Sequence, residues 1–198
     1  MNEDVMKEVL HRYLQEGRDA LVWKLDGLSE YDKRRPLVRT GTNLLGLVKH
    51  TALVESGYLG DTFGRPYEGW APAMSEESAN ANGDMWATRD ESSHEIIDFY
   101  RGVWAHSDET IESLPLHATG TVPWWPPEHA ETTLGHLIVR VVAETNRHAG
   151  QADVVRELID GTAGLRAPGN NLPDRDEAWW TEYRQALEGV ALSFRPQA

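Results

Sequence analysis

The sequence contains no cysteine, and this absence excludes several kinds of chemistry at once. Disulfide bridges, thiolate metal sites and cysteine nucleophiles are all ruled out, so the thiol of any thiol reaction must come from a substrate. The sequence also lacks an apolar run of the roughly 20 residues that a membrane-spanning helix needs. Its acidic start, Met1 to Asp4, shows no signal-peptide pattern. We therefore expect a cytoplasmic protein with no membrane partner.

Positive charge is scarce compared with negative charge. The 198 residues include 19 Lys and Arg against 32 Asp and Glu, which gives a formal net charge of −13. Such a surface repels phosphate backbones, so a nucleic-acid partner is not expected. With 40% hydrophobic residues the chain suits one globular domain, residues 1–198, with a full-sized core.

Helical periodicity dominates the sequence, and no stretch alternates for long enough to predict a strand. Apolar residues recur at intervals of three and four in four long segments, at about 4–25, 43–63, 90–114 and 132–160. A shorter helix is expected at about 175–192, where Asp174 is the N-cap signal. The predicted fold is all-α: a four-helix bundle with an additional C-terminal helix packed on it.

Two long loops interrupt this pattern. The first covers 65–88 and is expected to hold one short helical turn at 75–81, while the second covers 117–131. Trp124 and Trp125 in the second loop would either wall a pocket or cover the end of the bundle. Thr42 is the predicted N-cap of the second long helix.

Three polar residues stand on predicted apolar helix faces. Glu144 and His148 are four residues apart on the last long helix, so they lie one turn above the other. His50 falls between Leu47 and Val54 on the apolar face of the second predicted long helix, 43–63. An inward His on one helix and an inward Glu-x-x-x-His on another are what a metal site in a bundle core needs. Two nitrogen ligands and one oxygen ligand leave an open position, as in catalytic zinc sites.

Each of these residues also has a simpler interpretation. A lone inward histidine such as His50 can be a hydrogen-bonded core residue. Glu144 and His148 can form an ordinary i,i+4 pair on a solvated face. Glu55 either orients a metal ligand or is solvated or ion-paired, and Arg147 either binds an anionic group of a substrate or cosubstrate or is a plain surface arginine.

The two segments that carry these residues resemble known proteins. Residues 46–55, GLVKHTALVE, and residues 144–157, ETNRHAGQADVVRE, are similar to the two metal segments of DinB/YfiT-like proteins, in the same order and separation. The resemblance spans nearly all of 1–190. It implies a DinB-type four-helix bundle with His50, Glu144 and His148 as metal ligands. Many members carry a third histidine where this chain has Glu144, and the His, Glu, His version resembles the mycothiol-dependent maleylpyruvate isomerase branch and its actinobacterial relatives.

The resemblance also implies a function. The superfamily includes transferases and isomerases that use a low-molecular-weight thiol such as mycothiol or bacillithiol, so we expect a metal-dependent enzyme acting on a small-molecule substrate. Zinc is the first choice of metal, with nickel or another divalent ion as alternatives. A non-catalytic, stress-associated metal- or ligand-binding protein and a metal-dependent hydrolase are the competing functions. The resemblance is compatible with a homodimer, although no heptad surface requires one.

Overall fold

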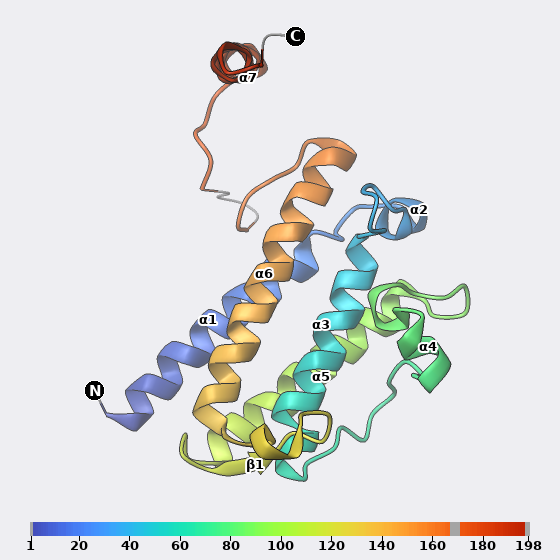
Figure 1. Ribbon diagram of the computed structural model, residues 1–198, viewed down its shortest axis with the longest axis vertical. Helices are drawn as coiled ribbons and strands as arrows, with labels where there is room; N and C mark the ends of the chain where they lie inside the picture. Colours follow the sequence, from blue (N-terminus) through green and yellow to red (C-terminus); the bar gives the residue numbers. More distant parts are fainter. Residues whose placement is uncertain (1, 167–170, 197–198) are drawn as a thin grey trace.

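The computed structural model describes residues 2–166 and 171–196, and α-helices dominate it (Figure 1). The four long helices are α1 (Glu3–Trp23), α3 (Leu44–Leu59), α5 (Ser93–Ser113) and α6 (Leu134–Asp160). The shorter helices are α2 (Glu30–Arg34), α4 (Glu76–Asn80), α7 (Glu177–Ser193) and the 3-10 turns η1 (Asp61–Phe63), η2 (Gly83–Met85) and η3 (Pro127–His129). The all-α prediction is confirmed: α3, α5 and α6 lie within the segments whose periodicity predicted them, and α1 begins one residue before its predicted segment.

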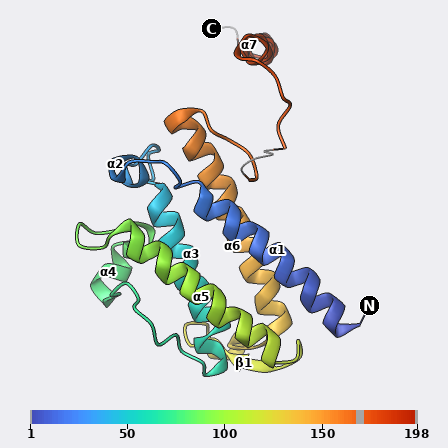
Figure 2. The ribbon, with the colours of Figure 1, turned by 180° about the vertical axis from the view of Figure 1, so that it is seen from behind.

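The four long helices pack side by side around an apolar interior that consists of two clusters of buried residues (Figures 1 and 2). Helix α3 contacts both α5 and α6, and α1 contacts α6 and α5. Because α3 has neighbours on several sides, most of it is buried, including Leu45, Leu47 and Val48. His50 lies on α3, on the side of this central helix that faces α6.

Local capping sets where the helices begin and end. Asn43, not the predicted Thr42, is the N-cap of α3, and its side chain accepts a hydrogen bond of 2.8 Å from the Gly46 backbone N–H. Both residues are good N-caps by type, so composition alone could not separate them. Helix α6 ends at the C-cap Gly161, whose φ of 77° lies in the left-handed region that glycine adopts without strain.

A small β-hairpin corrects the prediction that the chain has no strands. Strand β1 (Thr119–Thr121) pairs antiparallel with β2 (Glu131–Thr133). Strands of three residues are too short to show alternation in a sequence. Between them, Trp124 and Trp125 both make edge contacts with the ring of Tyr58 on α3, so the two tryptophans cover that end of the helical core.

The C-terminal helix α7 forms as predicted, but its predicted packing on the other helices is wrong. None of its residues is buried, and both views show it apart from the long helices (Figures 1 and 2). Its N-cap is Asp176 and not Asp174. The aromatic side chains of α7 contact one another instead, since Trp179 stacks on Tyr183 with ring centroids 5.2 Å apart. Across the described residues, no helix combines the length and the apolar character that a membrane span requires.

Candidate metal centre

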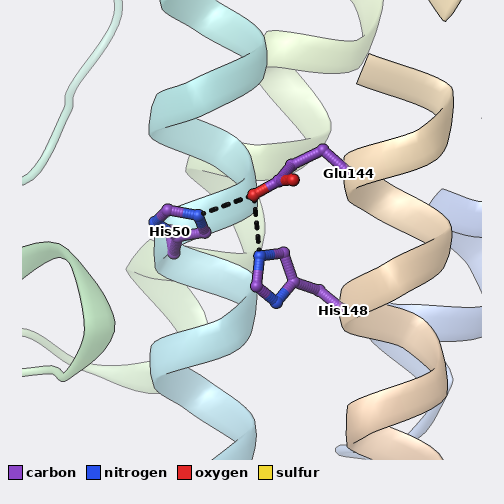
Figure 3. Close-up of side chains that lie close together, drawn as sticks. All are labelled: His50, Glu144 and His148. Carbon is purple, nitrogen blue, oxygen red and sulfur yellow. Dashed lines mark hydrogen bonds and ion pairs between the residues drawn. The ribbon is translucent and has the colours of Figure 1, made fainter. Parts of the chain in front are cut away.

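Three side chains from two helices converge between α3 and α6 (Figure 3). Nε2 of His50, on α3, lies 3.3 Å from Oε1 of Glu144, and Nε2 of His148 lies 3.0 Å from the same oxygen. One donor atom from each residue lies within 4.8 Å of the other two. The structure thus brings together the three residues that the sequence predicted as ligands.

The helix faces explain this convergence. Glu144 and His148 lie one turn apart on α6, on the side that packs against α3. His148 is 6% exposed, whereas the Glu144 side chain is 34% exposed. The group therefore lies at the edge of the apolar interior, with the carboxylate nearest to solvent. The Glu144 carboxylate and, to a smaller extent, the His50 ring are therefore in contact with solvent.

Each imidazole is held from behind by an oxygen. Nδ1 of His50 lies 2.7 Å from Oδ2 of Asp84 in η2, and Nδ1 of His148 lies 2.7 Å from Oε1 of Gln151, one turn further along α6. An ionised carboxylate and an amide oxygen only accept hydrogen bonds, so Nδ1 of each ring carries the proton. In the neutral ring the lone pair is then on Nε2, which faces the centre of the group. Metal-ligating histidines are oriented in this way by partners outside the ligand set.

The donor set fits a divalent cation. With neutral rings, two nitrogen lone pairs face a carboxylate oxygen that is itself an acceptor, and either a proton on Nε2 or a metal ion between the three atoms removes that mismatch. Tetrahedral zinc bonds of about 2.0 to 2.1 Å place neighbouring ligand atoms about 3.3 Å apart. The observed separations of 3.3 and 3.0 Å from Oε1 of Glu144 are close to that value. His50, Glu144 and His148 are therefore suitable metal ligands by chemistry, and two of their three separations match the tetrahedral spacing, with all three donor atoms within 4.8 Å of one another.

The surroundings also set the charge of the carboxylate. Without a bound cation, partial burial opposes ionisation of Glu144, but hydrogen bonds from the Nε2–H groups of protonated His50 and His148 and the charges of those rings outweigh that effect and hold its pKa below the ordinary value. Glu144 is thus an anionic oxygen donor at neutral pH. One carboxylate and two neutral imidazoles would balance only one of the two charges of a divalent cation, which would therefore still attract a further anionic ligand.

Two residues of this site were not predicted from the sequence. Gln151 stands three residues after His148, and that helical spacing could have indicated it. Asp84 is 34 residues from His50, in a loop, so no local spacing could have pointed to it. Of the alternatives for Glu55, the ion pair is confirmed: its carboxylate lies 2.5 Å from the Arg18 guanidinium, and both side chains are fully buried.

Arg147 does not join the group of three. It immediately precedes His148 on α6, its side chain is exposed, and it lines an open pocket of about 450 Å³.

The comparisons with known proteins agree with this geometry. A family model described as mycothiol S-transferase matches residues 9–161. The chain belongs to the mycothiol S-transferase family. The matched span runs from α1 to the end of α6 and includes all three clustered residues, whereas α7 lies outside it. The predicted resemblance to the DinB-like, mycothiol-dependent proteins is confirmed. A search of curated proteins finds no match.

Proposed function

We propose that the protein is a divalent-metal-dependent transferase that joins a low-molecular-weight thiol, with mycothiol as the first candidate, to a small molecule. The observation that carries this proposal is the convergence of His50, Glu144 and His148, with Asp84 and Gln151 holding the rings so that both Nε2 atoms face the centre. Membership of the mycothiol S-transferase family supports the choice of thiol. Zinc suits two nitrogen ligands and one oxygen ligand.

The chain supplies three ligands and leaves a fourth position for an exogenous group. A divalent cation held here would stabilise an incoming thiol as its thiolate, the reactive nucleophile, near neutral pH. Asp84 accepts the Nδ1 proton of His50 and so strengthens Nε2 as a donor. The partly exposed Glu144 marks the side from which the thiol arrives. Since the chain has no cysteine, no internal thiolate competes for the open position.

The wider setting of the site belongs to the same proposal. We assign α1, α3, α5 and α6 to the DinB-type four-helix bundle, within a single domain of residues 1–198. The proposed compartment is the cytoplasm, because small thiols stay reduced there.

Calorimetry tests the proposal. Metal-loaded protein is titrated with mycothiol and with S-methylated mycothiol, in two buffers of different ionisation enthalpy. We expect tight binding of mycothiol with release of about one proton, because the thiol enters and the thiolate stays. The S-methylated form should bind more weakly and release no proton. His50→Ala serves as the control and should bind neither metal nor thiol with the parent's affinity.

The outcomes separate the competing functions. Equal binding of mycothiol and its S-methylated form contradicts thiol activation. In that case, turnover of an ester or amide without added thiol would establish a hydrolase. Thiol binding without turnover of any tested electrophile would establish a non-catalytic binding protein.

A further inference from the structure

An open pocket of about 450 Å³ lies next to the metal centre. Its walls come from the segment before α3, with Val38 and Thr42, and from α6, with Arg147, Gly150, Gln151 and Val154. This volume falls within the range of small-molecule sites. One wall is the exposed segment before α3 and the other is a face of α6.

One residue joins the pocket to the proposed metal site. Gln151 lines the pocket, and its Oε1 lies 2.7 Å from Nδ1 of His148. A molecule in the pocket therefore lies against the side chain that orients a metal ligand. A second substrate bound there would lie behind the His148 ring, on the Nδ1 side, with His148 between it and the position proposed for the thiol.

The lining combines exposed apolar side chains with one positive charge. Val38 is 43% exposed and Val154 is 59% exposed, so the walls offer apolar surface to solvent. The charged member of the lining is Arg147, and no carboxylate lies beside it among the described lining residues. Within the described part of the chain, Arg147 has no hydrogen bond, ion pair or ring contact, although acidic residues outnumber basic ones by 32 to 19. A guanidinium with no protein partner beside an apolar wall suits a ligand that has both an anionic and an apolar part.

We propose that this pocket binds the acceptor substrate, and that the acceptor is an amphiphilic organic anion. Its carboxylate or sulfonate lies at the Arg147 guanidinium, and its apolar body lies on Val38 and Val154. The role of acceptor rests on the proposed thiol-transferase function. The binding itself requires no metal, so it is measured separately.

The first test uses octanoate as the probe and 1-octanol as its uncharged counterpart. Both are titrated into protein freed of metal with a chelator, so that no carboxylate can bind a metal ion. We expect saturable octanoate binding that is at least about tenfold tighter than octanol binding, since a charge-assisted hydrogen bond contributes that much. Arg147→Gln should remove this preference, and Arg147→Lys should restore part of it. Arg89→Gln is the matched control, because Arg89 is exposed and does not line the pocket.

The second test fills the pocket without disturbing the fold. A Cβ added at Gly150 would meet nothing within 4 Å, and glycine is a poor residue for a helix interior, so Gly150→Leu should keep the helix intact. Gly189, inside α7, is equally open and provides the matched control, Gly189→Leu. We expect Gly150→Leu to weaken octanoate binding about tenfold, by occupying the apolar wall, and Gly189→Leu to leave it unchanged.

These results are distinct from those that test the proposed function. Octanoate binding that is no tighter than octanol binding, or that survives unchanged in Gly150→Leu, overturns this inference. If that happens while mycothiol still binds with proton release, the pocket assignment alone is wrong. If octanoate binds as expected but mycothiol does not, the thiol-transferase function is wrong and the ligand class of the pocket stands.

Discussion

Replacing Asp84 tests whether the histidines are held as metal ligands. Oδ2 of Asp84 accepts the Nδ1 proton of His50 at 2.7 Å and so directs the Nε2 lone pair of that ring to the centre of the site. Asp84→Asn removes the negative charge and lets an amide N–H face Nδ1 instead. The proton then moves to Nε2, and His50 must lose it again before it can bind a metal. Asp84→Ala removes the acceptor altogether and leaves the ring free to turn.

The size of the expected effect follows from the geometry. Partners of this kind typically account for 10- to 100-fold in metal affinity, which corresponds to about 1.4 to 2.7 kcal/mol. The contact is short, but the Asp84 side chain is 31% exposed, so water can replace part of the lost interaction. We therefore expect a loss of about tenfold for Asp84→Asn, near the lower limit of that range. His50→Ala, which deletes the ligand itself, should lose considerably more.

Competition with a chromophoric chelator measures these affinities directly. Asp90→Asn is the matched control, because Asp90 is an exposed residue of the same loop region and the substitution changes the net charge equally. The metal affinity of Asp90→Asn should equal that of the parent. If Asp84→Asn and Asp90→Asn bind zinc with equal affinity, Asp84 does not orient His50. Circular dichroism of each variant confirms that the helical content is unchanged.

The other predictions concern the ligands and the buried charges. His148→Ala should lose most of the bound metal by elemental analysis while keeping its helical signal, and stoichiometric metal in that variant would exclude His148 as a ligand. Glu144→His should retain metal and Glu144→Leu should lose it; tight binding by the Leu variant would make Glu144 a structural carboxylate. Glu55→Ala removes the fully buried partner of the Arg18 guanidinium, which keeps its ion pair with Asp108 at 2.8 Å, so chemical denaturation should show a loss near the lower end of about 3 to 5 kcal/mol in unfolding free energy at unchanged metal affinity. Burial opposes ionisation of Glu91, but hydrogen bonds from the buried Lys49 side chain and from the Thr88 backbone N–H keep the pKa of Glu91 below the ordinary value. A carboxylate whose pKa is lower in the folded than in the unfolded protein stabilises the fold at pH values above its unfolded pKa, and this stabilisation is lost as the pH falls through its folded pKa. The difference in melting temperature between the parent and Glu91→Gln should therefore shrink on acidification. A difference that stays constant with pH contradicts this account.

The long helices were predictable because their burial is one-sided and repeats with the helical period. Residues such as Leu21 and Val141 are fully buried at positions that the periodicity marked as apolar. The ends were harder to place, since adjacent capping residues compete and only the backbone conformation decides between them. The extended φ and ψ of Asn43 made it the cap of α3 in preference to Thr42.

The hairpin and α7 show two different limits of sequence patterns. Strands β1 and β2 are too short to be detected by alternation, and they form because the chain returns over η1, where Gly120 lies close to Thr62. For α7 the pattern correctly indicated a helix with an apolar stripe, but a stripe does not specify what it contacts. Packing is a property of two surfaces, and the sequence of one helix describes only one of them.

The three clustered residues were predictable because each breaks an apolar face, and polar groups on such faces need a partner. The residues behind them were not equally visible. Gln151 follows His148 by one helical turn, whereas Asp84 reaches His50 only through the path of the loop between α3 and α5. Site residues that come from loops depend on tertiary structure, and no spacing rule in one sequence can locate them.

The charges around the site link the proposed metal to the proposed anion pocket. The carboxylate of Glu144 would balance one of the two charges of a divalent cation held between neutral histidines. A thiolate and an organic anion would then add two negative charges, in a chain that already carries a net charge of −13. Binding both at once requires a cation that no carboxylate has neutralised, and Arg147 is placed to be that cation in the pocket beside His148. For this reason Arg147→Gln should weaken the binding of the anion more than that of the thiol, which has the metal as its partner.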